Sequence, residues 1–530
     1  MTKPQFDVAI VGAGFAGIYL LYRCRQLGLT AHVWEAGGGV GGTWYWNRYP
    51  GARCDIESMQ YSYQFDQDLQ QEWDWSERYS PQPEILRYAE HVAERHNLLD
   101  GITFNRRVAT ACYDEQDSTW TLASEDGAEL TARVCVMATG CLSKPNWPDI
   151  NGLGSFQGEV HHTALWPHTG VDFTNKRVAV IGTGSSAIQS IPLIAQDAAD
   201  LTVFQRTPNY SIPAHNAPMD PQYAADIKAN YAEMRARAKQ SVPGIYGRYN
   251  PDSAMAASAE ERHAEFERRW QEGGLLFMGA YGDLMFDQAA NDSLVAFVHD
   301  KIRGILNDPD VAEKLCPKNI IGGKRLCVDT NYYATYNRDH VHLVDLSETP
   351  ISTVNATGVN VGDTQYDVDI IVIATGFDAM TGALTSIDIR GRGDASLGER
   401  WRDGPSSYLG LAMADFPNLF TVTGPGSPSV FTNMLPTIEQ HVEWITDCIM
   451  HMNRGDYHAI EATKDAEEAW WNHVQEVGQL GLKQSTDSWY MGANVAGKAR
   501  VFMPYYGGFP AYCQKCEEVV GNGYEGFVLS

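Results

Sequence analysis

The sequence predicts an α/β fold with two Rossmann-like domains and a helical insertion. Two observations support this fold class: a strand, glycine turn and helix occur in that order twice, and a charged helical stretch lies between further strand signals. Each unit has the order expected where a parallel sheet passes from its first strand into its first helix. A length of 530 residues also indicates several domains, at roughly 100–200 residues each.

The first unit begins with the apolar strand Phe6 to Val11 and continues through G-A-G-F-A-G into an apolar helix pattern. Its glycines allow a tight turn and a close approach of the backbone to a pyrophosphate at the helix N-terminus; they are Gly12, Gly14 and Gly17. Glu35 ends the next strand, where its carboxylate can accept hydrogen bonds from a ribose diol. The first unit therefore predicts a dinucleotide site.

The second unit has the strand Arg177 to Ile181 followed by G-T-G-S-S-A, so that alanine takes the third glycine position. The next strand ends in Arg206 and Thr207, and an arginine there can pair with a 2′-phosphate that an acid would repel. This difference predicts NADPH rather than NADH, and two sites of opposite preference indicate a flavoprotein reduced by NADPH. The turn residues expected to hold the second nucleotide are Gly182, Gly184, Ser185 and Ser186.

The region between about 213 and 324 loses strand alternation and favours helices, which predicts the insertion. Strand signals return at 342–344 and 368–373, and a Gly/Tyr/Pro-rich loop is expected at 503–512. We predict a FAD-binding domain built from both ends of the chain, with an NADP-binding domain nested inside it. The expected boundaries are 1–145 (FAD domain, first part), 146–212 (NADP domain, first part), 213–324 (helical insertion), 325–383 (NADP domain, second part) and 384–530 (FAD domain, second part, with a C-terminal lid loop).

The composition limits the partners. A formal net charge of −26 disfavours binding to nucleic acid or to an anionic membrane. No apolar stretch of about 18 residues predicts a transmembrane helix, and the N-terminus leaves no room for a signal peptide, so we expect a cytoplasmic protein. Ten scattered cysteines predict reduced thiols; Cys513 and Cys516 form a C-x-x-C without a second ligand pair nearby, so no metal site is expected.

Two long motifs add a family resemblance. The segment Gly41 to Asp55 reads G-G-T-W-Y-W-N-R-Y-P-G-A-R-C-D, and Phe156 to Pro167 fits the pattern F-x-G-x-x-x-H-x-x-x-W-P. Both resemble signatures of the type I, FAD- and NADPH-dependent Baeyer–Villiger monooxygenases, in wording closest to the aryl-ketone and steroid-ketone members. The resemblance extends to Ala-Thr-Gly at 138–140 and 374–376 and is weakest in the helical insertion.

The resemblance implies a fold of the flavoprotein monooxygenase type and a defined reaction. One oxygen atom of dioxygen is inserted next to a ketone carbonyl to give an ester or lactone, through NADPH-reduced FAD and a C4a-peroxyflavin. The resemblance places the active-site arginine at Arg325, paired with Asp55, and a lysine for the 2′-phosphate at Lys324. An arginine suits the anions of this reaction because it does not give up its proton. Further implied cofactor contacts are Gly42, Thr43, Trp44, Ala374 and Thr375.

The resemblance also implies a mobile C-terminal lid that carries Trp489. The expected partners are a small-molecule ketone and dioxygen, and the expected assembly is a monomer or a weak homo-oligomer. The residues expected to line the substrate pocket are Ser429, Val430, Phe431 and Met434. The residues of the second signature, for which we expect an inter-domain packing or hinge role, are Phe156, Gly158, His162 and Trp166.

Three other classes remain as alternatives. A heteroatom oxygenase, which oxidises nitrogen or sulfur with the same flavin, would not need Arg325 as an oxyanion partner. A disulfide reductase requires a C-x-x-C near the flavin, and the one in this sequence lies far along the chain. A non-catalytic NADPH-sensing flavoprotein would leave both signatures and the pair Lys324-Arg325 without a use.

Overall fold

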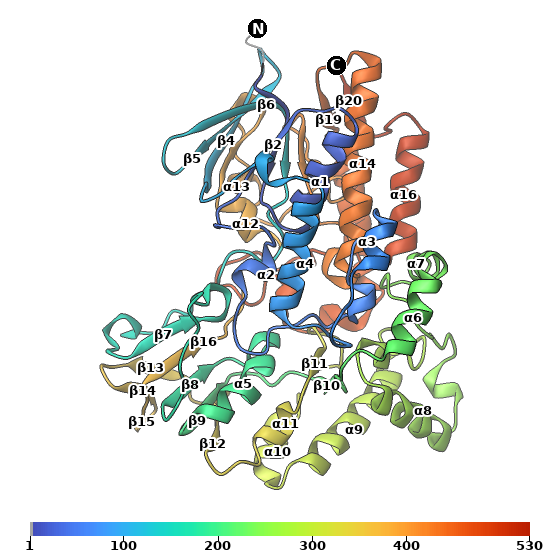
Figure 1. The fold of residues 1–530 in the computed structure, drawn as a ribbon. Coiled ribbons are helices and arrows are strands. Elements are labelled where there is room, and N and C mark those ends of the chain that lie inside the picture. Colours follow the sequence, from blue (N-terminus) through green and yellow to red (C-terminus); the bar gives the residue numbers. More distant parts are fainter. Residues whose placement is uncertain (1–3) are drawn as a thin grey trace.

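The fold was analysed in a computed structural model that describes residues 4–530 (Figure 1). Residues 1–3, which belong to the segment where we expect no signal peptide, lie outside the described residues. The predicted fold class is confirmed, because two sheets that contain parallel strands of the Rossmann type lie one above the other in Figure 1. Helices pack around both sheets, and the C-terminus lies at the top of this view.

The first sheet has eight strands in the order β17-β4-β5-β6-β1-β2-β3, with β18 against β6. The strand β1 is parallel to both β2 and β6, and its last four residues are buried, as expected for a strand covered on two faces. Strands from both ends of the chain therefore build one sheet. Their bounds are β1 Phe6–Val11, β2 Ala31–Trp34, β3 Ile102–Thr103, β4 Val108–Asp114, β5 Thr119–Ser124, β6 Glu129–Met137, β17 Asp388–Arg390 and β18 Leu419–Thr421.

Helices on this sheet also come from both ends of the chain, and α1 packs against α14. The long helices are α1 Phe15–Gln26, α4 Gln82–Arg95, α14 Met434–Gly455, α15 Lys464–Gln479 and α16 Phe509–Gly521. The short ones are α2 Thr43–Trp46, α3 Gln67–Glu72, α12 Gly382–Thr385 and α13 Leu397–Arg400, and a small antiparallel pair joins β19 Ile460–Ala462 to β20 Phe527–Leu529.

The predicted loop at 503–512 is wrong in its last part, because α16 begins at Phe509. Pro510 occupies the first turn of this helix, where a fixed φ and a missing N–H suit the helix start rather than a loop. Cys513 and Cys516 lie on α16 as free thiols.

The second sheet is parallel throughout, in the order β12-β9-β8-β16-β7. The strand signals at 342–344 and 368–373 are confirmed by β12 and β16. The bounds are β7 Glu159–His162, β8 Arg177–Ile181, β9 Asp200–Gln205, β12 Val341–Asp345 and β16 Ile370–Ile373, with α5 Ser185–Asp197 and α11 Tyr332–Thr335. A separate antiparallel sheet contains β13 Ile351–Val354, β14 Gly358–Val361 and β15 Thr364–Asp367.

The insertion consists of helices whose starts are marked by the sequence. The residues Asp220, Ser258, Asp287 and Asp308 each accept a hydrogen bond from a backbone N–H of the first turn, which stabilises the helix start. The helices are α6 Pro221–Ala229, α7 Tyr231–Lys239, α8 Ala259–Glu272, α9 Gln288–Ile305 and α10 Pro309–Leu315. The strand β10 Ser211–Pro213 pairs with β11 Cys327–Asp329, so the insertion leaves and rejoins the chain at one place.

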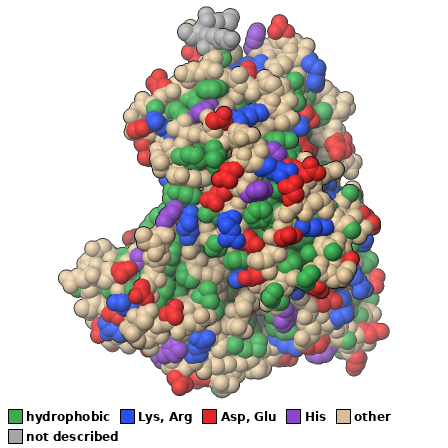
Figure 2. Space-filling model, viewed as in Figure 1, with side chains coloured by type: hydrophobic (Ala, Val, Ile, Leu, Met, Phe, Trp, Pro, Cys, Tyr) green, Lys and Arg blue, Asp and Glu red, His purple; other side chains and the backbone are tan. Residues whose placement is uncertain are grey.

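The surface drawn in Figure 2 carries acidic and basic side chains close together, and the outline narrows between the two sheet domains. Within residues 4–530, no helix is both long enough and apolar enough to cross a bilayer.

Candidate active site

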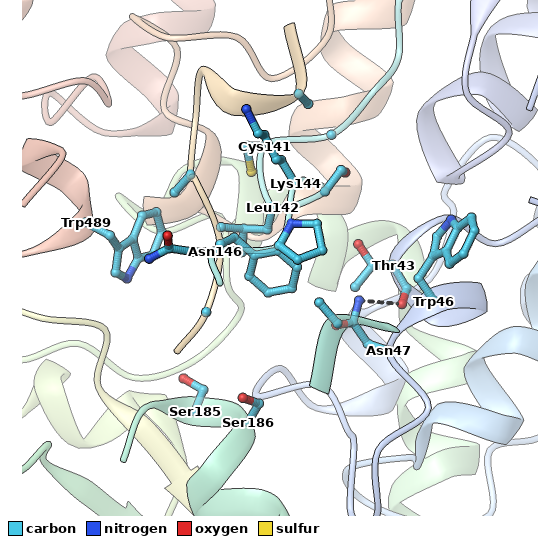
Figure 3. A pocket seen from close by; sticks show the side chains of 18 of the residues that line it. Thr43, Trp46, Asn47, Cys141, Leu142, Lys144, Asn146, Ser185, Ser186 and Trp489 are labelled. Carbon is cyan, nitrogen blue, oxygen red and sulfur yellow. Dashed lines mark hydrogen bonds between the residues drawn. The ribbon is translucent and has the colours of Figure 1, made fainter. Parts of the chain in front are cut away.

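A cavity of about 1380 Å³ lies where the two glycine turns meet. A pocket for one small molecule measures roughly 300–1,000 Å³, so this cavity has room for more than one ligand. Figure 3 shows Trp489 and Asn146 on one side of the cavity, Thr43 and Asn47 on another, and Ser185 at the start of α5.

The three glycines of the first turn differ in what a side chain at each position would contact. A Cβ on Gly12, whose φ is +104°, would lie 2.7 Å from the Ala138 carbonyl oxygen, and one on Gly17 would lie 1.9 Å from the Gly12 oxygen. A Cβ on Gly14 would meet protein only at an ordinary 3.5 Å, at the Cα of Gly42, and Gly14 lines the cavity. The fold itself requires Gly12 and Gly17, whereas Gly14 leaves room for a ligand against the backbone.

The second turn repeats this arrangement. A Cβ on Gly182, whose φ is +113°, would lie 2.5 Å from the Ala374 oxygen, while one on Gly184 would have no protein atom within 4 Å. Ser185 and Ser186 begin α5 at the cavity wall. Two open backbone cradles at two helix N-termini fit two pyrophosphate groups, which are the groups that FAD and NADPH present.

Glu35 lies at the first cradle, buried, with both carboxylate oxygens engaged by backbone. The Ala13 N–H donates to Oε2 at 2.6 Å, and the Gly37 N–H donates to Oε1 at 2.7 Å. Each carboxylate oxygen has two lone pairs, so Glu35 can still accept a hydrogen bond from a ribose hydroxyl. The residue also lines the cavity.

Two cations line the cavity at the second cradle. Arg206 and Lys324 form no ion pair with any residue in the range 4–530, and Arg206 is exposed. Burial, and after it the charge of Arg206, lowers the pKa of the Lys324 amine. Thr207, whose carbonyl oxygen accepts a hydrogen bond from the Thr183 hydroxyl at 2.8 Å, lies beside them. The Asp487 carboxylate opposes the shift of the Lys324 pKa, but it forms no ion pair with Lys324 in the described chain, and two crowded cations of this kind fit a bound phosphate.

Arg325 and Asp55 form an ion pair in the cavity wall, with Nη2 3.5 Å from Oδ2. The Asp55 side chain is 10% exposed and the Arg325 side chain 31%. Burial raises the pKa of the Asp55 carboxyl, and Arg325 opposes that shift. Burial on its own would lower the pKa of Arg325, but the neighbouring groups, Asp55 first among them, together raise it, so the guanidinium stays charged. The second Arg325 nitrogen, Nη1, donates to the Val430 carbonyl at 3.2 Å.

Gln189 is a contact that the sequence analysis missed. Its Nε2 donates to Oδ1 of Asp55 at 3.4 Å, and its Oε1 accepts from the Tyr49 hydroxyl at 2.8 Å. Gln189 lies four residues after Ser185, on the same side of α5, and this spacing is the signal that would have identified it. The amide links the second glycine-turn helix to the first signature segment.

The cavity contains most, but not all, of the predicted site residues. Gly17 is not on the wall, because it packs beneath Gly12. Ser429 and Phe431 are also not on the wall: they belong to a one-turn 3-10 helix, Ser429–Phe431, whose successive side chains point in different directions, and Phe431 packs on Tyr490. The predicted residues on the wall are Gly12, Gly14, Glu35, Gly42, Thr43, Trp44, Asp55, Gly182, Gly184, Ser185, Ser186, Arg206, Thr207, Lys324, Arg325, Ala374, Thr375, Val430, Met434 and Trp489.

The four predicted residues of the second signature are not on the cavity wall, although Ala164 and Leu165 of the same segment are. His162 is buried at the end of β7, where Nδ1 accepts from the Ala164 N–H at 3.0 Å. Trp166 is buried, and a Cβ on Gly158 would lie 2.6 Å from the ring of Phe156. Among residues 4–530, no group of three or more His, Cys, Asp or Glu side chains is placed to hold a metal ion.

The predicted lid segment, which carries Trp489, contacts two connecting stretches of chain, one after β6 and one after β16. Trp489 begins a 3-10 turn, Trp489–Met491, on the cavity wall. The Asn146 side chain donates to the Asn494 carbonyl at 2.9 Å, and the Asn494 side chain donates to the Phe377 carbonyl at 2.7 Å. These bonds hold the segment over the cavity in this structure.

Known proteins resemble this chain in sequence and in structure. Residues 9–250 match the family described as pyridine nucleotide-disulphide oxidoreductase. The chain is 41% identical to phenazine N-monooxygenase from Lysobacter antibioticus (99% of this chain, 97% of the relative). It is 40% identical to a Baeyer–Villiger monooxygenase from Pseudooceanicola batsensis (99% and 96%). It is also similar to the solved structure of an oxidized steroid monooxygenase bound to NADP, with a TM-score of 0.95, 51% identity and 99% of each chain covered.

Fold and cavity together define a two-domain enzyme that uses a flavin and a pyridine nucleotide. The chain belongs to the Baeyer–Villiger monooxygenase family, and its cofactors are FAD and NADPH. The predicted family and cofactors are confirmed. Cys513 and Cys516 do not line the cavity, so the cysteine pair required by a disulfide reductase is not at this site.

Proposed function

We propose that this enzyme oxygenates bulky ketones of the aryl-alkyl or steroid kind, giving an ester or a lactone. In the balanced reaction, ketone, dioxygen, NADPH and a proton give the ester, NADP⁺ and water. The observation that carries the proposal is the Arg325–Asp55 pair, because it places a permanent cation in the wall between the two nucleotide cradles.

The role proposed for Arg325 is electrostatic. Bound FAD, once reduced, supplies the activation of dioxygen. Negative charge then develops on oxygen, and a fixed guanidinium stabilises that charge without having to reorient. Asp55 holds the guanidinium in place, and Gln189 holds Asp55. One donor of this kind contributes roughly 3–4 kcal/mol to stabilisation of the transition state.

Arg206 and Lys324 are proposed to bind the 2′-phosphate of NADPH, because within residues 4–530 neither cation forms an ion pair and both line the cavity at the second cradle. Gly14 and Gly184 leave space for the pyrophosphates, and Glu35 accepts from the ribose of FAD. Trp489 and its segment are proposed to exclude water from the reacting atoms.

The substrate class has two supports. The chain is 51% identical to the steroid monooxygenase whose solved structure is described above. The cavity wall also includes the apolar side chains of Val430 and Met434, and the flexible Met434 can adapt to a large apolar ketone. We also propose the domain boundaries predicted from the sequence, with a FAD-binding domain built from both ends of the chain.

The test is a set of turnovers under ¹⁸O₂ with an aryl-alkyl ketone, a steroid ketone and cyclohexanone, followed by mass spectrometry. We expect one ¹⁸O atom in the ester of the two bulky ketones and a lower kcat/KM for cyclohexanone. A preference for cyclohexanone would contradict the proposed substrate class.

A second candidate function is oxygenation of an aromatic nitrogen, because one full-length relative is a phenazine N-monooxygenase. Phenazine is added to the same panel for this reason. Formation of an N-oxide with no ester from any ketone would favour this function over the proposed one.

A further inference from the structure

Lys483 lies beside the active site and takes no part in the functions assigned above. Its amine lies over three aromatic rings, at 4.9 Å from the ring centre of Phe431 and 5.7 Å from those of Tyr490 and Tyr506. Its Nζ donates to the Gly322 carbonyl at 2.5 Å. Within residues 4–530, Lys483 forms no ion pair with a carboxylate.

An ammonium in such surroundings loses hydration, and one hydrogen bond with three ring faces compensates only part of that loss. A methionine would fill the same space among the rings without that cost. The need to fill space therefore does not explain a lysine at this position. Its hydrogen bond to the Gly322 carbonyl does, because a methionine could not donate it.

Gly322 belongs to the loop that leads into Lys324 and Arg325. The same loop also packs on the C-terminal segment, by which we mean the stretch from Lys483 to Tyr490. A Cβ on Gly323 would lie 2.3 Å from the Thr486 hydroxyl oxygen of this segment. Lys483 and Thr486 thus hold this loop from one side over two consecutive residues.

The turn Ser429–Phe431 completes a closed set of contacts. Arg325 donates to the Val430 carbonyl at 3.2 Å, while the ring of the next residue, Phe431, lies under the Lys483 amine. Phe431 and Tyr490 are themselves 4.6 Å apart between ring centres. The loop, the turn and the C-terminal segment each contact the other two. Lys483, on the C-terminal segment, contacts the loop at Gly322 and the turn at Phe431.

We propose that Lys483 is a positioning residue, whose ammonium ties the C-terminal segment to the Gly322 carbonyl and so sets the place of Lys324 and Arg325. The proposal rests on the roles proposed above for those two residues. It predicts that the charge of Lys483, rather than its volume, maintains the loop.

The first experiment compares Lys483→Met with Lys483→Arg in the FAD-loaded protein. Lys483→Met should melt no lower than the wild type, since an apolar side chain fits the rings. Amide hydrogen exchange in residues 320–326 should rise on the order of tenfold, and the NADP⁺ dissociation constant should rise about 10-fold or more. Lys483→Arg should recover most of both losses, because it keeps the cation and a donor.

Lys464→Met is the matched control. Lys464 is exposed and pairs with Asp415 at 3.1 Å at the start of α15, so its loss should change NADP⁺ binding by less than about twofold. Unchanged exchange and unchanged NADP⁺ affinity in Lys483→Met would overturn the proposal.

A second measurement uses the wild type and needs no variant. Burial, and after it the charge of Arg325, lowers the pKa of the Lys483 amine to about 7. The other ionisable groups around the amine keep their charge state from pH 6 to 9: Arg325 remains a cation, and burial raises the pKa of Tyr490 and of Tyr506.

Deprotonation of Lys483 above pH 7 weakens its bond to Gly322, so residues 320–326 should be less protected at pH 9 than at pH 6, after correction for intrinsic exchange. Lys324, in the same loop, also has a lowered pKa and faces Arg206 and Asp487. A response that persists in Lys483→Met would assign the effect to Lys324 and overturn the proposal. Because exchange is read without any ketone, a failed ketone assay would contradict the proposed function alone.

Discussion

In the first sheet domain, the strand after the glycine turn is followed by Glu35, whose carboxylate already accepts from the N–H groups of Ala13 and Gly37. In the second domain, the corresponding strand is followed by Arg206, which is exposed and forms no ion pair within residues 4–530. The backbone cradles are alike, but the first is organised by its own acid and the second leaves cations for a ligand to neutralise. This difference suits a resident FAD and an exchangeable NADPH.

The strongest way to break this comparison is to block each cradle in turn. Gly14→Val should yield a folded protein with essentially no bound flavin, because the side chain would occupy the ligand's place against the backbone. Gly184→Val should keep its flavin and lose reduction by NADPH. Flavin absorbance and stopped-flow reduction measure the two outcomes. Flavin retained in Gly14→Val would show that the first cradle is misassigned.

The Arg325–Asp55 pair joins the two regions, and its loss should have the next largest effect. Arg325→Ala should lower the rate of ketone oxygenation about 10²–10³-fold, because the developing negative charge loses its donor. Arg325→Lys should recover little, since an ammonium lacks the planar fork. Asp55→Ala should have a smaller effect in the same direction. Product yield and flavin reduction are measured separately, and normal ester yield in Arg325→Ala would remove this arginine from the mechanism.

The cations of the second cradle should show a coenzyme-specific effect. Arg206→Ala and Lys324→Ala should each raise KM for NADPH by roughly 10- to 100-fold, which corresponds to about 1–3 kcal/mol for a lost charge-assisted hydrogen bond. KM for NADH should barely change, because NADH has no 2′-phosphate. Equal losses with both coenzymes would indicate a general loss of structure. The matched first-domain variant, Glu35→Gln, should alter flavin retention and leave the coenzyme preference unchanged.

Trp489 should have the mildest effect, because it belongs to neither cradle. Trp489→Ala should retain FAD and still be reduced by NADPH, but should release several-fold more hydrogen peroxide per NADPH consumed, since water reaches the reacting atoms. Peroxide and ester are quantified against NADPH consumption. Coupling equal to that of the wild type would exclude the lid role.

Local patterns predicted the features that local chemistry determines. The glycine turns and the strands at 177–181 and 342–344 lie within motifs that can be read in sequence, whereas the Arg325–Asp55 pairing joins residues remote along the chain and was implied only by the family resemblance. The orientation of Phe431 was missed because a 3-10 turn and its packing partners, rather than its neighbours in sequence, determine which side chains reach the cavity. Lys483 was missed for a similar reason, since its partners Gly322 and Phe431 are remote along the chain.

The pairing of β18 with β6 has a consequence for biosynthesis. Leu419 of β18 lies opposite Cys135 of β6, whereas every strand of the second sheet lies between Glu159 and Ile373. During translation the second sheet is complete when the first still has an unpaired edge, and long-range pairing of this kind is slow to form. We therefore expect nascent chains that stop before β18 to contain a folded second domain and an aggregation-prone first one.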